Sequence, residues 1–182
     1  MTGLSVTPDR VFALSESRIS DLQSSRPTHV VAGVIIDPRG RVLLARRAEG
    51  SELAGLWEFP GGRVEPDESP EQATVREFME ETGFAVRVAA RYGVIRHGYT
   101  TYRLTLHCFG LELANSGANA QAAPQGDACP TPPQLTAATQ YRWATPDELE
   151  GLAMPAAHRK LADSLFGLSG EASPLHAGLQ KK

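Results

Sequence analysis

Apolar residues recur in short runs whose composition and spacing predict strands. Residues 29–37, HVVAGVIID, are rich in β-branched side chains and end at the turn signal DPRG. Residues 41–47, RVLLARR, resume the apolar pattern, so the two runs predict a β-hairpin. A short strand, LWEF (56–59), then leads into PGGRVEPDE (60–68), where proline and glycine favour a turn over regular structure.

The next segment, SPEQATVREFMEETG, carries signals for both ends of a helix. Ser69 can cap the first turn, Pro70 occupies the first helical position, and Gly83 closes the last turn. The sequence therefore predicts a helix between Ser69 and Gly83.

The second half of the chain predicts three more strands and two more helices. The strands are expected at 84–99, 100–113 and 140–145, and the second of them alternates as a half-buried strand does. PDELEGL predicts a short helix, and PAAHRKLADSLFGL an amphipathic one that buries Leu161, Leu165 and Phe166. Strands on both sides of a central helix indicate an α/β fold, an α/β/α sandwich with a mixed central sheet.

The organisation along the chain predicts one domain with appended segments. We expect the domain to comprise residues 29–168 and to contain a low-complexity insertion at 114–134, ANSGANAQAAPQGDACPTPPQ. Residues 1–28 are expected to form an N-terminal extension, and residues 169–182 a flexible C-terminal tail.

Composition and charge exclude several classes of protein. A chain of 182 residues that is 41% hydrophobic can build one substantial core, and its net charge of −3 disfavours a non-specific grip on nucleic acid. Cys108 and Cys129 suggest neither a disulfide framework nor a zinc site, which favours a reducing compartment. The start of the chain lacks a signal-peptide pattern, and no stretch approaches the roughly 18 apolar residues of a membrane span. We therefore expect a soluble, cytoplasmic protein.

Glu77, Glu80 and Glu81 concentrate negative charge on one turn of the predicted helix. Residues three and four apart share a helix face, so each such pair repels by about a few tenths of a kcal/mol or more. Clustered carboxylates are ligands that Mg²⁺ or Mn²⁺ prefers, although a glutamate run is also typical of a solvated helix face. The interleaved Phe78 and Phe84, with a glycine-rich turn ahead of the helix, favour the metal site.

These residues carry a resemblance to the Nudix family. The Nudix box, G-x5-E-x7-R-E-U-x-E-E-x-G-U with U a bulky apolar residue, is matched at every defined position by Gly62, Glu68, Arg76, Glu77, Phe78, Glu80, Glu81, Gly83 and Phe84. The preceding ARRAEGSELAGLWEFPGG is similar to the MutT-like branch of that family. The resemblance implies the Nudix fold and Mg²⁺-dependent hydrolysis, with Mn²⁺ as an alternative, of a nucleoside diphosphate linked to another group.

The same resemblance implies roles for individual residues. Glu77, Glu80 and Glu81 would hold the ions together with the backbone carbonyl of Gly61, and Glu77 or a neighbour would take the proton of the attacking water. Gly62, Glu68, Arg76 and Gly83 would be structural. Arg76 would tie Glu68 to the helix, although contact with phosphate is an alternative.

Substrate choice depends on residues outside the box. In MutT-like enzymes that remove oxidised guanine nucleotides, the positions of Arg47, Phe59 and His158 surround the nucleotide, which favours a nucleoside triphosphate hydrolysed to monophosphate and pyrophosphate. The guanine-specific relatives carry asparagine at the position of His158, and an imidazole offers a different hydrogen-bonding pattern. Each residue also has an alternative interpretation without a substrate. Arg47 would be a solvated charge at a strand end, Phe59 would pack in the core, and His158 would lie on a helix surface.

Two departures from the family pattern leave alternatives open. The stretch LTAATQYRW has no acid before Trp143, where many relatives carry another metal-binding glutamate, so Glu65 or Glu112 is a candidate substitute. The stretch IRHGYTTYRLTLHCF resembles the C-terminal domain of MutY adenine glycosylases, which suggests a non-catalytic 8-oxoguanine recognition module, although Thr101 replaces the second histidine of that pattern. His97, Tyr99 and Tyr102 are then candidates to lie near the nucleotide.

Other Nudix substrates, namely ADP-ribose, dinucleoside polyphosphates and capped RNA, also stay open. The sequence does not specify the oligomeric state, and a homodimer is one option.

Overall fold

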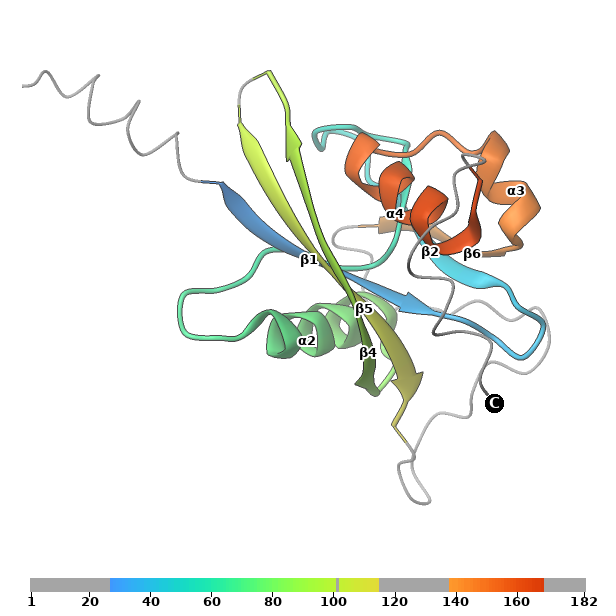
Figure 1. Cartoon of the computed structure of the whole chain (residues 1–182), viewed down its shortest axis with the longest axis horizontal. Coiled ribbons are helices and arrows are strands. Elements are labelled where there is room, and N and C mark those ends of the chain that lie inside the picture. Colours follow the sequence, from blue (N-terminus) through green and yellow to red (C-terminus); the bar gives the residue numbers. More distant parts are fainter. Residues whose placement is uncertain (1–26, 101, 115–137, 169–182) are drawn as a thin grey trace, which may run out of the picture.

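The computed structural model describes residues 27–100, 102–114 and 138–168 (Figure 1). Most of the expected N-terminal extension and insertion, and all of the expected C-terminal tail, lie outside the described residues.

The described strands form two three-stranded sheets. In the first, with the order β1-β5-β4, β1 (Thr28–Ile35) runs parallel to β5 (Arg103–Leu113), and β4 (Val86–Gly98) runs antiparallel to β5. The second sheet is antiparallel and has the order β3-β2-β6, with β3 at Trp57–Glu58, β2 at Val42–Arg47 and β6 at Ala138–Ala144. The parallel pair makes the first sheet mixed, as the sequence predicts.

The predicted hairpin of β1 and β2 is wrong, because these strands belong to different sheets. Only an isolated bridge between Ile36 and Val42 joins them. Both edges of β1 are already paired: β5 lies along one, and the segment Pro60–Val64 hydrogen-bonds along the other. The apolar run of β1 is therefore buried on both faces, with Val31 in one core cluster and Ala32 in the other.

The central helix α2 (Pro70–Thr82) begins and ends where the sequence predicts. The Ser69 side chain accepts from the backbone N–H of Gln72, whose side chain in turn accepts from the Ser69 N–H, and Gly83 ends the helix in the left-handed conformation. Phe78 anchors the helix to the first sheet: its side chain is fully buried, and a Cβ atom at Gly33 of β1 would lie 2.9 Å from its ring.

Two further helices cover the opposite side. These are α3 (Pro146–Gly151) and α4 (Ala156–Phe166), and Figure 1 shows them across the strands from α2. Leu161 and Leu165 of α4 are buried as predicted, and Phe166 is partly buried against the same cluster. Helices on both sides of the strands confirm the α/β/α fold class, with two sheets between them in place of one.

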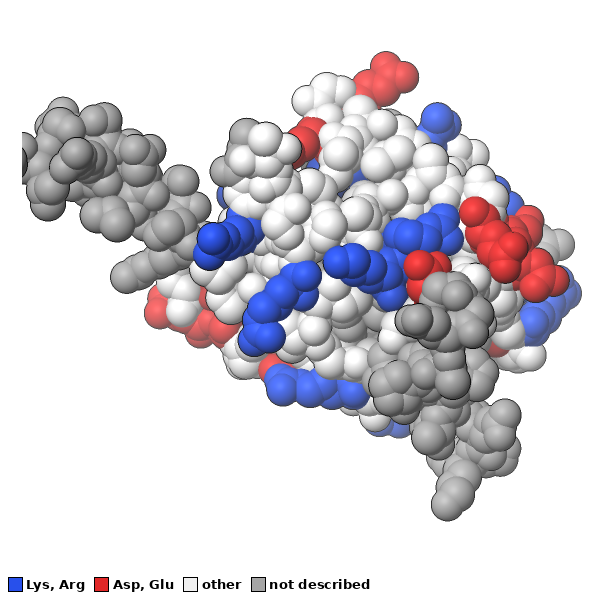
Figure 2. Space-filling model, turned by 45° about the horizontal axis from the view of Figure 1, so that its top comes forward, with Lys and Arg blue, Asp and Glu red and all other residues white. Residues whose placement is uncertain are grey.

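The face shown in Figure 2 carries both signs of charge: lysine and arginine side chains lie across its middle, and acidic side chains gather at its right-hand edge. Among the described helices, none has the length and apolar character required to cross a membrane.

Truncating Phe78 should cost a large part of the stability of the fold. For Phe78→Ala we expect the free energy of unfolding to fall by about 3–5 kcal/mol, because the change leaves a cavity between α2 and the sheet. Urea denaturation followed by circular dichroism measures it. The matched control is Met79→Ala, one residue along the helix and 49% exposed, which should stay within about 0.5 kcal/mol of the parent. Equal losses in both variants would contradict this placement of α2.

Candidate active site

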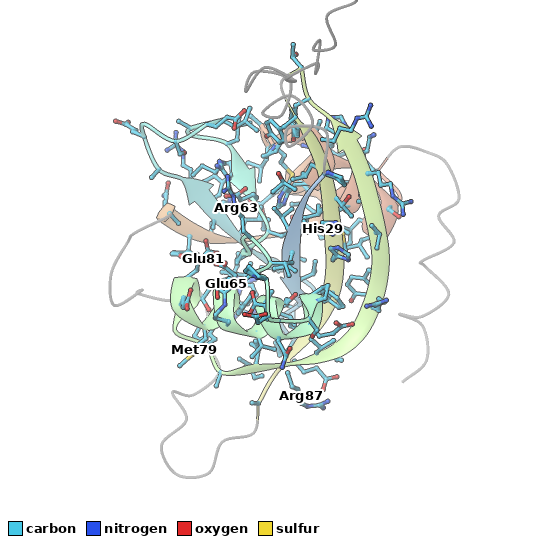
Figure 3. All side chains as sticks on the ribbon, turned by 90° about the vertical axis from the view of Figure 1, so that its left-hand side faces the viewer. His29, Arg63, Glu65, Met79, Glu81 and Arg87 are labelled. Atoms are coloured by element: carbon cyan, nitrogen blue, oxygen red, sulfur yellow. The ribbon has the colours of Figure 1, made fainter. Side chains whose placement is uncertain are left out.

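Helix α2 presents its acids to the Gly61–Gly62 turn, called here the glycine turn. The Gly61 N–H donates to Glu81 Oε2 over 3.0 Å. A Cβ atom built on Gly62 would lie only 2.3 Å from the Glu77 carboxyl carbon. Figure 3 shows Glu81 on the side of α2 that faces the strands, with Met79 on the opposite side. The spacing of the acids along the helix therefore directs two of them onto one backbone turn.

Arg76 holds the acidic face together. Its Nε and Nη2 atoms bind the Glu68 carboxylate at 3.1 and 2.6 Å, which is the pairing that the sequence suggests. Its Nη1 atom contacts Glu77 Oε1 at 2.9 Å and Glu80 Oε2 at 3.2 Å. The hydrogen bonds to Glu68 are the main cause of a raised pKa for Arg76 and lower the pKa of Glu68. One cation thus spans three carboxylates and reduces their repulsion.

Burial raises the free-energy cost of ionising Glu77 and Glu81. Desolvation raises the pKa of Glu81 to about 8; the Gly61 N–H partly offsets this rise, and the Glu58 and Glu77 carboxylates add to it. Burial likewise raises the pKa of Glu77, against the effect of Arg76. The Glu80 side chain differs, since it is 60% exposed.

The donor set fits a hard divalent cation. Glu77 and Glu81 offer half-buried carboxylate oxygens whose charge the protein compensates only in part, and a divalent cation beside the glycine turn would complete that compensation. Within residues 27–100, 102–114 and 138–168, no group of three or more acidic, histidine or cysteine side chains lies close enough together to hold a metal ion without rearrangement. Arg76 and the Gly61 N–H hold the carboxylates in their present positions.

A cavity of about 480 Å³ opens beside the glycine turn. Its polar lining comes from β2, β3, the glycine turn, the tip of the β4–β5 hairpin and α4, and includes Arg47, Glu58, Arg63, Tyr99, Tyr102 and His158. Gly61 and Gly62 belong to this lining, so one end of the cavity is formed by the turn on which Glu77 and Glu81 lie.

Arg47 lines the cavity but is also held by the protein. Its Nη1 atom donates to both carboxylate oxygens of Glu58 at 2.9 Å, and its Nε donates to the Glu52 carbonyl at 2.8 Å. Burial raises the pKa of Glu58, and Arg47 opposes that shift. Glu58 is a site residue that the sequence analysis missed. The sequence signal for Glu58 was the alternation of side chains along a strand, which places it on the face opposite to its apolar neighbours Trp57 and Phe59.

His158 is buried and neutral. Its Nδ1 atom accepts from the Phe59 backbone N–H over 3.2 Å, and burial lowers its pKa to about 4. The ring hydrogen therefore resides on Nε2, which lies 3.8 Å from Glu58 Oε2. Phe59 is 1% exposed and belongs to the core, and it meets His158 both through its backbone N–H and through its ring, whose centroid lies 6.2 Å from that of the imidazole.

The β4–β5 hairpin contributes an aromatic wall. The rings of Tyr99 and Tyr102 lie 4.7 Å apart between centroids at an angle of 25°. The Tyr99 hydroxyl hydrogen-bonds to the backbone of Ala157, at the start of α4. His97 is not part of the cavity lining; it packs edge-on against Tyr99 and contacts Lys160 Nζ at 3.3 Å.

The two candidate substitutes for the missing glutamate have different positions. Glu112 pairs with Arg87, which Figure 3 places beyond α2 and away from Glu81. Glu65 lies in the loop before α2, where its backbone N–H donates to Glu68. From β6, Tyr141 reaches α2 and donates its hydroxyl to the Glu81 carbonyl at 2.7 Å. Tyr141 is the second site residue that the sequence analysis missed. In the sequence it stands out only as one apolar position of the predicted strand QYRWAT.

The fold and this site have counterparts among known proteins. The family model described as NUDIX domain matches residues 31–164. The chain belongs to the Nudix family. Nudix hydrolases generally use a divalent metal ion, and membership makes this protein a pyrophosphohydrolase, in agreement with the enzyme that the sequence predicts.

Individual Nudix relatives differ in their named substrates. The chain is 38% identical over 88 residues to an 8-oxo-dGTP diphosphatase of Proteus vulgaris, covering 48% of this chain and 79% of the relative. It is 55% identical over 58 residues to a CTP pyrophosphohydrolase of Escherichia coli, covering 32% and 43%. The solved MutT protein of Methanosarcina mazei shares the fold with a TM-score of 0.62 at 24% identity, over 81% of this chain and 98% of that one.

The glycine turn should tolerate no side chain at position 62. In Gly62→Ala the added Cβ displaces the Glu77 carboxylate, so we expect kcat/KM for nucleotide hydrolysis to fall by about 10²-fold with little change in far-UV circular dichroism. The control is Gly151→Ala, where a Cβ meets nothing within 4 Å. Parent-like turnover in Gly62→Ala would show that Glu77 does not need this contact.

The buried His158 should make the fold sensitive to mild acid. Unfolded His158 takes up a proton near its ordinary pKa of 6.5, whereas the folded residue does so only near 4. Its neutral form therefore stabilises the fold above pH 6.5, and that contribution is lost as the pH falls toward 4. Between pH 7 and 5 the parent should lose about 2 kcal/mol more than His158→Asn, which keeps an acceptor for Phe59. Urea denaturation at both pH values measures this difference, and equal losses would exclude a neutral His158.

Proposed function

We propose that this chain is a Mg²⁺-dependent pyrophosphohydrolase of nucleoside triphosphates, oxidised or ordinary, that releases the monophosphate and pyrophosphate. One observation carries the proposal. The half-buried carboxylates of Glu77 and Glu81 lie on one side of the glycine turn, and the cavity of about 480 Å³ lies on the other. Relatives named 8-oxo-dGTP diphosphatase and CTP pyrophosphohydrolase support a nucleotide substrate.

The phosphate end of the substrate belongs at the glycine turn. Glu77, Glu81 and the Gly61 carbonyl would hold the Mg²⁺, with the exposed Glu80 at its outer side. The ion supplies neutralisation of the phosphate charge and activation of a water. Arg76 keeps the glutamates in place through its bonds to Glu77 and Glu80.

The nucleoside end belongs in the cavity, where flat and polar surfaces meet. The Tyr99 and Tyr102 rings offer an aromatic surface on which a base can stack. The Nε2–H of His158 and the Glu58 carboxylate set a hydrogen-bond donor beside an acceptor. A single donor is less selective than a side-chain amide, which supports the acceptance of more than one base. Arg47 would act here by holding Glu58 in place.

The test is a nucleotide panel assayed with and without Mg²⁺. We expect 8-oxo-dGTP, dGTP, CTP or dCTP to give monophosphate and pyrophosphate by product chromatography. Glu77→Gln and Glu81→Gln should lower kcat by about 10²–10⁴-fold, because each replaces a carboxylate that can bind Mg²⁺ with a neutral amide. Glu150→Gln is the matched control, with the same change of charge at an exposed position of α3, and should retain activity.

Two results would overturn the proposal. One is turnover that stays unchanged in both Glu77→Gln and Glu81→Gln. The other is a panel in which no nucleoside triphosphate is hydrolysed while a compound such as ADP-ribose is.

A further inference from the structure

Two histidines meet on the first sheet, and neither belongs to the lining of the cavity. His29 of β1 and His107 of β5 place Nδ1 and Nε2 at 3.0 Å from each other. The ring planes differ by 24° and the centroids lie 5.3 Å apart, so the N···N contact lies close to the line between the ring centres. The rings therefore meet edge to edge, and one ring hydrogen lies between two nitrogens.

The backbone fixes this meeting. In the parallel register of β1 and β5, His29 lies opposite Thr105 and His107 lies opposite Val31, so the two histidines are diagonal neighbours. The His29 carbonyl also accepts from the Val64 N–H. The His29 side chain is exposed and that of His107 is half-buried, which leaves solvent access to the pair. Two imidazoles are thus held side by side on a rigid, open surface.

This arrangement matches what two adjacent ligands of one metal ion require. Two nitrogens, each about 2.0–2.1 Å from a shared ion, lie about 3 Å apart when they occupy neighbouring coordination positions. A neutral imidazole carries one hydrogen, and moving it to the outer ring nitrogen turns both inner nitrogens into acceptors without a change in net charge. Each ring must then turn by roughly 40° out of the present N···N line to direct its lone pair at an ion about 2.0–2.1 Å away, and the exposed position of His29 leaves room for that turn.

We propose that His29 and His107 form a bidentate site for a divalent transition-metal cation such as Zn²⁺, Ni²⁺ or Cu²⁺, separate from the acidic face of α2. Imidazole nitrogen favours these ions over Mg²⁺, which prefers oxygen, so the two sites select different metals. Water would complete the coordination at the exposed side. The site therefore binds one ion per chain and is independent of nucleotide hydrolysis.

The surrounding charges modulate the site. Arg91 and Arg96 of β4 repel a cation, and Glu71 of α2, which pairs with Arg91 at 2.5 Å, offsets part of that repulsion. Burial is the first cause of a lowered pKa at His107, and the neighbouring cations add to it, so its lone pair stays available at neutral pH. Added salt screens the arginines, and affinity for the ion should therefore rise with ionic strength.

Calorimetric titration of the untagged full chain with Ni²⁺, in excess Mg²⁺, tests the proposal. We expect one Ni²⁺ per chain, with affinity lowered at least about tenfold in His29→Gln and in His107→Gln. His97→Gln is the matched control, because it removes a histidine elsewhere on the same sheet, and it should bind as the parent does. Circular dichroism verifies that each variant is folded.

The outcomes separate this site from the proposed function. Absence of a stoichiometric Ni²⁺ isotherm in the parent, or equal affinity in the parent and both histidine variants, overturns the proposal. Binding that persists in Glu81→Gln, a variant expected to lose hydrolysis, supports a separate site. Loss of binding in Glu81→Gln would place the ion at α2 instead and overturn it.

Discussion

The arrangement of this protein depends on backbone hydrogen bonds that hold the segment Pro60–Val64 along one edge of β1. The Val31 N–H donates to the Gly62 carbonyl at 2.9 Å and the Gly33 N–H to the Pro60 carbonyl at 2.8 Å. The approach is so close that a Cβ on Gly61 would lie 2.1 Å from the Val31 carbonyl oxygen. The same contacts bring the glycine turn within reach of the α2 carboxylates, so strand pairing creates the active-site geometry.

A second constraint is the balance of charge on α2. Repulsion among crowded carboxylates is tolerated because Arg76 spans Glu68, Glu77 and Glu80, while Glu81 turns inward to a backbone N–H. Arg76 does not reach Glu81 in these contacts, and burial leaves that carboxylate with a raised pKa. Arg76 thus offsets part of the charge on Glu68, Glu77 and Glu80 and leaves Glu81 with a single backbone N–H, so a divalent cation near Glu81 would find a carboxylate that lacks a cationic side-chain partner among these contacts.

Sequence predicts the local parts of this design well, because they depend on spacing within one helix. Capping by Ser69 and termination at Gly83 follow from positions close along the chain, whereas the pairing of Arg76 with Glu68 was implied by the resemblance to the Nudix box. The pairing of β1 does not, since the same apolar run suits a hairpin and a doubly paired parallel strand equally. Glu58 and Tyr141 were missed for a related reason. Their roles depend on Arg47, His158 and Glu81, and only the assembled sheets and helices bring these together.

The cavity also shows why substrate choice is harder to infer than reaction type. The reacting end uses one helix and one turn, whereas the opposite end is assembled from β2, β3, the β4–β5 hairpin and α4. His158 links two of these parts, because its Nδ1 accepts from the Phe59 backbone while its Nε2–H faces Glu58. A change of residue type at position 158 therefore alters both the position of α4 against β3 and the hydrogen bonds offered to a base. The relatives named 8-oxo-dGTP diphosphatase and CTP pyrophosphohydrolase differ in their named nucleotides, as expected when the end of a site that meets the base is assembled from several separate elements.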